Sequence, residues 1–369
     1  MFAVLPALLL AFQAPSQATA RPSDRQTALV RLDSLVRQAM AAHRIPSAAI
    51  ALVHNGKVLR TAAYGPASLE LPAPAGPHTL FEIGSITKQF TGIAVLQLAE
   101  QGKLGLDDPI EKYLPEVPAA WHGITLHQLL THTSGLPDWE GTGLLSLSRN
   151  YTLAEFIAVN ASRPLGFAPG SRWAYSNSAF PLLGEVITRV SGVSYEAYVT
   201  EHILRPAGMT ETRFRHNDAV IPNRAAGYVD SAGRYWSAEP RRPELLLPNG
   251  GILSSAMDMA KWCLAVERSG LLKPESKTLM TTPVKLSDGS SFNAGIGWFM
   301  DTFHGHRMQL HNGATPAGFS SVLYMYPDYM YPDDRLCVVV LLSIDRGALV
   351  NDLATQLADL VIPGLAQEH

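Results

Sequence analysis

Ser85 and Lys88 stand three residues apart at the start of a helix that the apolar spacing predicts from Ser85 to about Gln101. A spacing of three puts both side chains on one helix face, with their tips within reach of each other. A serine hydroxyl needs a neighbouring base to become a nucleophile, and a desolvated lysine can be that base. The N-terminus of the helix would also offer N–H groups to a developing oxyanion. The pair therefore predicts nucleophilic catalysis.

A structural role for Ser85 is the alternative, because serine often caps a helix by accepting a free N–H of the first turn. Lys88 argues against this role, since a cation in the first turn opposes the helix dipole at a cost of about 0.3–1 kcal/mol. An S-x-x-K match also occurs by chance in a chain of this length, so the pair needs support from elsewhere in the sequence.

Two further short motifs give that support. Tyr175 and Asn177 flank Ser176, and a phenol beside Lys88 can relay a proton while an amide can donate to an acyl group. The run His311-Asn312-Gly313 precedes a stretch of small residues, where a strand edge would let a substrate backbone approach closely. Each motif alone is weak, but together they form an ordered S-x-x-K, Y-x-N and H-x-G set.

This ordered set resembles the serine β-lactamase and penicillin-binding-protein superfamily. In detail it is similar to class C β-lactamases and to their DD-carboxypeptidase, D-aminopeptidase and lactamase-type esterase relatives. Residues 81–85, 129–136 and 249–252 add to the resemblance, which extends from about residue 29 to the last predicted helix. It implies an acyl-enzyme mechanism without metal or organic cofactor.

The resemblance also implies catalytic roles for individual residues. Ser85 would be the acylated nucleophile, Lys88 would remove or relay its proton, and Tyr175 would stand in the proton-relay position. The backbone N–H groups of Ser85 and Ala314 would form the oxyanion hole. Because no separate carboxylate for deacylation is apparent, water activation would fall to Tyr175 and Lys88.

The substrate-binding residues implied by the resemblance are Asn177, His311, Asn312 and Gly313. Asn177 would contact the acyl amide, and the other three would replace the K-T-G strand of the lactamases. His311 is a departure from the lactamase pattern, because a neutral histidine holds an anionic carboxylate less well than a lysine. This lowers the expectation of β-lactamase activity and raises that of a peptidase or esterase.

We therefore expect an exported serine hydrolase that cleaves amide or ester bonds of small molecules or short peptides. A DD-peptidase, D-aminopeptidase or esterase is favoured. A class C β-lactamase is the alternative within the same chemistry, and a non-catalytic penicillin-binding-like protein is the alternative of another class.

The elements that must position these residues follow from local patterns. Two strand-like runs, residues 47–54 and 57–65, meet at Asn55-Gly56, the strongest short hairpin signal. Residues 319–326 and 336–343 read as strands near the other end, and helical patterns fill the middle. We expect an α/β (α+β) fold in which both chain ends build one antiparallel sheet flanked by helices.

The division expected along the chain is a signal peptide at residues 1–20 and one hydrolase domain at residues 21–369. The sheet lobe would comprise residues 25–90 and 250–369, with a mainly helical lobe at 91–249 inserted between them. Residues 3–12 are apolar but too few to span a bilayer, and Ala18-Thr19-Ala20 fits a secretory cleavage pattern, although no Lys or Arg precedes the apolar run. We expect export to the periplasm or medium and no membrane span in the mature chain; the oligomeric state stays open.

Composition excludes other classes. The net charge of −3 in 369 residues comes without a basic run, so a nucleic-acid partner is not expected. His304, His306 and His311 lie close in sequence, but zinc needs better-placed ligands, so no metal is expected. Two cysteines cannot form a disulfide scaffold. Cys263 and Cys337 are expected as core thiols, although their pairing stays open.

Overall fold

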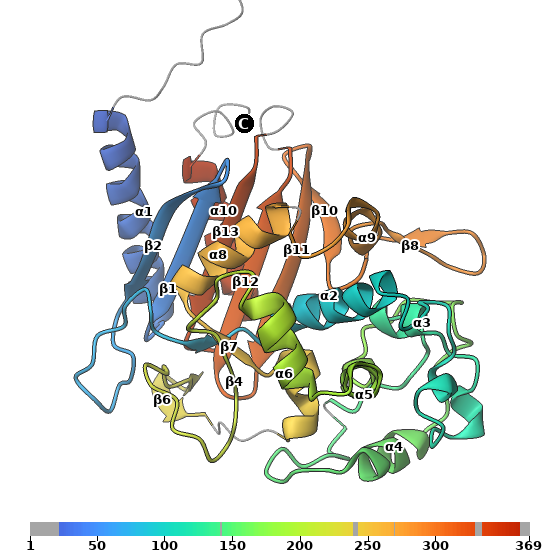
Figure 1. The fold of residues 1–369 in the computed structure, drawn as a ribbon. Coiled ribbons are helices and arrows are strands. Elements are labelled where there is room, and N and C mark those ends of the chain that lie inside the picture. The colour runs from blue at the N-terminus through green and yellow to red at the C-terminus, as the bar shows by residue number, and fades with distance from the viewer. Residues whose placement is uncertain (1–21, 141, 239–242, 269, 329–333, 362–369) are drawn as a thin grey trace, which may run out of the picture.

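The central feature is a six-stranded antiparallel sheet to which both ends of the described chain contribute (Figure 1). The computed structural model describes residues 22–361 apart from 141, 239–242, 269 and 329–333, so the expected signal peptide lies outside the described residues. In order across the sheet, the strands are β10 (Phe299–Phe303), β11 (His306–Thr315), β12 (Phe319–Tyr326), β13 (Leu336–Leu342), β1 (Ala48–His54) and β2 (Lys57–Tyr64). The expected fold class is confirmed.

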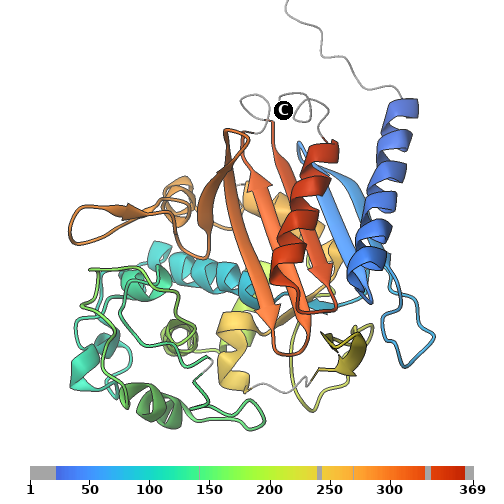
Figure 2. The ribbon, with the colours of Figure 1, turned by 180° about the vertical axis from the view of Figure 1, so that it is seen from behind.

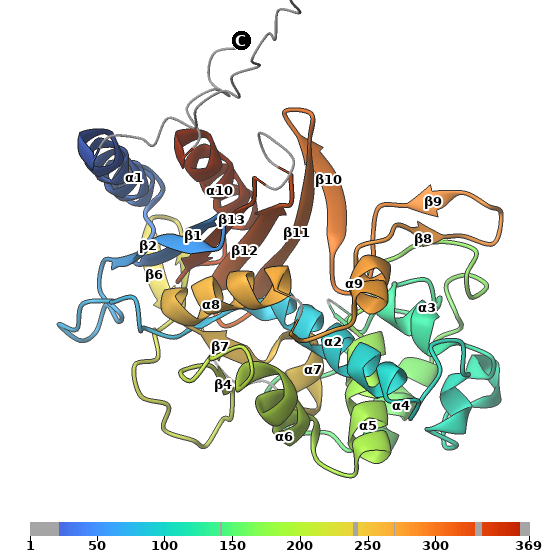
Figure 3. The same cartoon turned by 45° about the horizontal axis from the view of Figure 1, so that its top comes forward.

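The centre of the sheet is covered on both faces, which explains why β13 reads LCVVVLL without a polar residue. Val338 and Val340 belong to one apolar cluster together with residues of α1 (Pro22–His43) and α10 (Gly347–Val361). Val339 and Leu341 belong to the other, together with residues of α8 (Ala256–Glu267) and α2 (Thr87–Glu100). Figure 2 shows α1 and α10 on one face, and Figure 3 shows α8 on the opposite face.

The helical part of the chain lies beside the sheet and packs around α2 and α5. Its helices and the short helices near it are α3 (Leu126–Leu130), α4 (Leu153–Ala161), α5 (Ala179–Ser191), α6 (Tyr195–Val199), α7 (Leu247–Gly250) and α9 (Pro274–Met280). Three small sheets pair β3 (Phe81–Glu82) and β4 (Arg213–Phe214) with β7 (Ile252–Ser254), β5 (Tyr228–Ser231) with β6 (Arg234–Ser237), and β8 (Val284–Lys285) with β9 (Ser291–Phe292).

The turn predicted at Asn55-Gly56 is confirmed. Asn55 and Gly56 both adopt positive φ, 47° and 70°, as the two central residues of a tight hairpin between β1 and β2 require. In the middle of the chain α6 ends at Val199, and a π-helical turn, Thr200–Leu204, continues it. Among the described residues, no helix is long and apolar enough to cross a membrane.

Cys263 and Cys337 are bonded to each other, which answers the question of pairing that the sequence left open. Cys263 lies on α8 and Cys337 on β13, both fully buried, and their Cα atoms are 6.1 Å apart. The bond links residues 74 positions apart and therefore joins a covering helix to the centre of the sheet.

Candidate active site

Ser85 lies in a 3-10 turn, Gly84–Ile86, that connects β3 to α2. The residue that caps α2 is Ile86, without a side-chain cap bond, so the capping role considered for Ser85 is wrong. The half-buried Ser85 instead accepts a hydrogen bond at its Oγ from Lys88 Nζ, 3.0 Å away. The spacing of three residues thus brings a hydroxyl and an amine together.

The turn is held against β11 by an approach of two backbones that only glycine permits. A Cβ on Gly313 would lie 2.2 Å from the carbonyl oxygen of Ile83, and one on Gly84, which has φ +49°, would lie 3.0 Å from the nitrogen of Ala314. Ser321 on β12 donates a hydrogen bond to the same Ile83 oxygen at 2.7 Å. The backbone around Ser85 and that of Ala314 are therefore fixed side by side.

Lys88 is fully buried and donates three hydrogen bonds. Its Nζ lies 3.0 Å from Ser85 Oγ, 2.9 Å from Asn177 Oδ1 and 2.8 Å from the backbone oxygen of Asn249. It also lies over the rings of Tyr175 and Phe180, 4.9 and 5.1 Å from their centres. A buried amine costs free energy unless polar groups surround it, and these contacts supply them. The same contacts aim the amine at the serine.

Asn177 connects Lys88 to two carboxylates that the sequence had not indicated. Its Oδ1 accepts from Lys88, and its Nδ2 donates to Asp138 Oδ2 at 3.1 Å and to Glu140 Oε2 at 2.5 Å. Asp138 is half-buried and Glu140 is exposed. Both carboxylates contact the amide nitrogen of Asn177, so they place negative charge next to this side chain.

His311 lies on β11 with its ring buried near Tyr175 and Phe299, whose ring centres are 6.3 and 5.1 Å away. Burial, and next the charge of Lys88, lower the pKa of His311 to about 3, although its Nδ1 faces the oxygen of Asn312 at 2.7 Å. The imidazole is therefore neutral at physiological pH. Asn312 is half-buried and Gly313 buried, while Ala314 is exposed.

His132 is a second buried imidazole that the sequence had not marked as part of the site. Its ring stacks on that of Tyr175 at 4.5 Å, and its Nδ1 accepts the N–H of Ser176 at 3.1 Å. Burial, followed by the charge of Lys88, lowers the pKa of His132, so the ring is neutral and can act as an acceptor. His132 also has a positive φ of 60°. Through these two contacts His132 holds Tyr175 and Ser176 in place.

Replacing His132 by asparagine is expected to lower kcat/KM for ester hydrolysis about threefold to tenfold, because one stacked aromatic pair is lost. Asparagine tolerates the positive φ and can keep the acceptor for the Ser176 N–H. His122→Asn, a change at an exposed histidine, is the control and is expected to match the wild type. Equal kcat/KM for His132→Asn and the control, measured by initial rates, would contradict a positioning role for the ring.

The other histidines considered for zinc do not gather at the site. His306 begins β11, at the end opposite Gly313, and His304 lies 3.6 Å from Asp359 of α10. Over the described ranges, no group of three or more His, Cys, Asp or Glu side chains is arranged as metal ligands would be.

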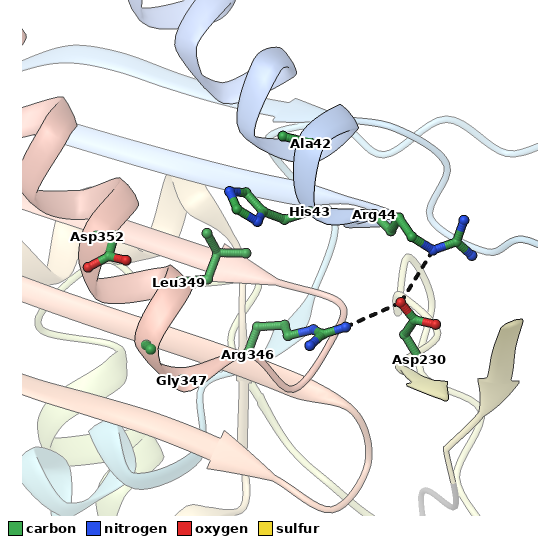
Figure 4. A pocket seen from close by; sticks show the side chains of 9 residues that line it. Ala42, His43, Arg44, Asp230, Arg346, Gly347, Leu349 and Asp352 are labelled. Carbon is green, nitrogen blue, oxygen red and sulfur yellow. Dashed lines mark hydrogen bonds and ion pairs between the residues drawn. The ribbon is translucent and has the colours of Figure 1, made fainter. Parts of the chain in front are cut away.

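A cavity of about 590 Å³ lies away from these residues, between α1, the β5–β6 hairpin and the start of α10 (Figure 4). Asp230 there accepts from Arg44 Nε at 3.3 Å and from Arg346 Nη2 at 3.2 Å. These ion pairs join the β5–β6 hairpin to the residue after α1 and the residue before α10. The lining of the cavity includes none of the candidate catalytic residues.

A family model described as beta-lactamase matches residues 32–361. Protein flp of Staphylococcus aureus (strain MW2) is 29% identical over 341 residues, which are 89% of this chain and 66% of flp. Penicillin-binding protein 4* of Bacillus subtilis (strain 168) is 29% identical over 294 residues, 74% of this chain and 64% of that protein. The chain thus spans slightly less than two thirds of the length of these curated relatives.

Two solved structures share the fold over most of the chain. The octameric penicillin-binding protein homologue from Pyrococcus abyssi superposes with a TM-score of 0.75 at 29% identity, covering 92% of this chain and 79% of that one. The penicillin binding protein from Bacillus halodurans gives a TM-score of 0.74 at 28% identity, covering 89% and 99%.

Proposed function

This chain belongs to the beta-lactamase family, and from that premise we propose that it is an exported serine hydrolase that cleaves ester or amide bonds through an acyl-enzyme on Ser85. The observation that carries the proposal is the 3.0 Å hydrogen bond between the buried Lys88 amine and Ser85 Oγ. A base within hydrogen-bond reach is what a serine needs to become a nucleophile.

The proposed reaction has two steps. The first step needs Lys88 as the neutral amine, whose lone pair accepts the Ser85 O–H along the same 3.0 Å contact. Ser85 Oγ then bonds to the substrate carbonyl carbon while its proton passes to Lys88, and the oxyanion accepts from the backbone N–H groups of Ser85 and Ala314. Tyr175 relays the proton to the leaving alcohol or amine as its bond to the acyl carbon breaks. Water, activated by Tyr175 and Lys88, then adds to the acyl-enzyme, releases the acid and restores Ser85.

Substrates without a carboxylate beside the scissile bond fit the charges of the site best. His311 is neutral and cannot replace the lysine that would attract an anionic β-lactam. Asp138 and Glu140 add negative charge next to Asn177, where the acyl group would lie. These charges favour esters and uncharged or cationic amides, of the D-aminopeptidase or esterase type, over a class C β-lactamase and over a DD-peptidase, whose leaving group carries a carboxylate beside the scissile bond.

Export is proposed on two grounds. The apolar residues 3–12 followed by Ala18-Thr19-Ala20 are typical of a secretory signal. The bond between Cys263 and Cys337 is of the kind that persists in oxidising compartments such as the periplasm or the medium.

The test is covalent mapping on the purified wild-type protein with p-nitrophenyl acetate, p-nitrophenyl butyrate and a fluorescent penicillin. We expect a burst of p-nitrophenol, continuing ester turnover, and an acyl group on the peptide that contains Ser85. A stable penicillin adduct without any turnover would support a penicillin-binding role, and penicillin turnover faster than ester turnover would support a β-lactamase. A folded protein with neither adduct nor turnover would overturn the hydrolase proposal.

A further inference from the structure

Four aromatic side chains run in contact from the proposed catalytic centre to the surface, and we call them the aromatic row: Tyr175, Phe299, Trp173 and Phe292. The ring centres of Tyr175 and Phe299 are 6.4 Å apart, and those of Phe299 and Trp173 are 5.9 Å apart. Trp173 and Phe292 stack in parallel at 4.1 Å with an interplanar angle of 9°. The row thus forms a continuous apolar path away from Lys88.

The outer end of the row is open to solvent. Phe292 is 38% exposed and ends β9, in the β8–β9 hairpin that projects from the body of the molecule (Figure 3). The hairpin is attached to the helical part by the Trp173–Phe292 stack and by a hydrogen bond from Ser287 N to Gly170 O of 2.9 Å. An exposed aromatic face continuous with a reactive centre is a surface on which an apolar substrate group can lie.

Asn177 and Tyr175 both contact the Lys88 amine, but their further neighbours differ in chemistry. Asn177 is hydrogen-bonded to Asp138 and Glu140, so its surroundings are polar and negative. Tyr175, which hands a proton to the leaving group in the proposed reaction, is followed by the apolar rings of the row. The leaving group therefore has to lie against Tyr175, at the inner end of the row.

We propose that the aromatic row binds an apolar or aromatic leaving group, so that the preferred substrates are esters or amides of bulky apolar alcohols or amines. This inference rests on the proposed function. The row would discriminate between substrates at the acylation step, because the leaving group has departed before water attacks the acyl-enzyme. Phe292 is then a specificity-determining residue at the outer end of the row.

The test compares 6-phenylhexyl acetate with hexyl acetate in the whole protein, because the six-carbon chain lets the phenyl ring lie along the row towards Phe292. Both esters give the same acetyl-enzyme, and their alcohols have similar acidity, so a difference in kcat/KM reports contact with the leaving group. We expect the wild type to prefer 6-phenylhexyl acetate about tenfold, and Phe292→Ala to lower that ratio about fivefold through loss of one aromatic contact. Phe292→Tyr, which retains the ring, is expected to keep the ratio.

Trp236→Ala is the matched control, since Trp236 is a 56% exposed aromatic residue on β6, in another hairpin, and is expected to change neither rate. Turnover of both esters with the same ratio in Phe292→Ala and wild type would overturn the role of the row and leave the hydrolase proposal standing. A Phe292→Ala effect on hexanoate against acetate esters of one alcohol, without a leaving-group effect, would also overturn it. A folded wild type that hydrolyses neither ester would overturn both proposals.

Discussion

Lys88→Met is expected to lower kcat/KM for ester hydrolysis by roughly 10³-fold or more while the protein stays folded, because a positioned general base contributes about 10²–10⁴-fold. Methionine has nearly the length of lysine and fills the same apolar surroundings without a charge. Ser85 Oγ then loses the amine that lies 3.0 Å away and is left with the reactivity of an ordinary hydroxyl.

Lys88→Arg tests whether catalysis needs the basic lone pair of Lys88 or only its positive charge. A guanidinium stays protonated at any working pH, so it keeps the positive charge but cannot accept the proton of Ser85. We expect it to be as inactive as Lys88→Met and Ser85→Ala in initial-rate and adduct assays. Activity of either lysine variant close to that of the wild type would contradict the role of Lys88.

The pKa of His311 is a second quantity to measure in the Lys88→Met variant. Because the charge of Lys88 helps to lower the pKa of His311, Lys88→Met is expected to raise that pKa above its value of about 3. The pKa should stay below the ordinary value of about 6.5, since burial is the larger cause and remains. NMR titration of the ring measures this, and an unchanged pKa in Lys88→Met would contradict the proximity of the two groups.

Neutral His311 also sets a direction for acid stability. Its pKa is lower in the folded chain than in the unfolded one, so the unfolded state binds the proton first as the pH falls. The neutral ring contributes fully to the free energy of unfolding above a pH of about 6.5. This contribution is lost progressively as the pH falls from there towards about 3.

Those parts of the site that depend on neighbours in the chain could be predicted from the sequence. The i,i+3 spacing of Ser85 and Lys88 is local geometry, and it suffices to put the two side chains in contact. The Asn55-Gly56 turn is local in the same sense, because its two positive φ angles are those that asparagine and glycine tolerate. The strand runs at both chain ends are local patterns too, whereas their pairing in one sheet joins residues as distant as Ala48 and Leu342.

The contacts that sequence reasoning missed depend on packing between distant segments. Asp138 and Glu140 reach Asn177 across 39 and 37 residues, through a loop whose path no local pattern encodes. His132 lies in a run that the sequence had marked only for its resemblance, and its place beneath Tyr175, 43 residues later, follows from the folded helical part. The contact of Phe292 with Trp173 likewise requires the β8–β9 hairpin to return to the Y-x-N segment.

Loss of the bond between Cys263 and Cys337 is expected to lower the free energy of unfolding by about 2–5 kcal/mol. The bond closes a span of 74 residues, and without it the unfolded chain gains the conformational freedom that the link removes. Reduction of the wild type by dithiothreitol isolates this effect, because the side chains are otherwise the same. Guanidinium unfolding of the oxidised and reduced protein measures the difference, with a shift of the midpoint to lower denaturant expected on reduction.

The double variant Cys263→Ala, Cys337→Ala extends the comparison, since both sulfurs are buried and their removal also leaves space in the core. It should therefore be less stable than the reduced wild type, yet keep ester turnover at temperatures where it stays folded, because neither cysteine contacts Ser85, Lys88 or Tyr175 in the proposed reaction. Its stability should not respond to dithiothreitol. Coincident unfolding curves for oxidised and reduced wild type would show that the bond contributes nothing to stability. Two alkylatable thiols in protein purified from the periplasm would show that the bond does not form there, and would remove one of the two grounds for proposing export.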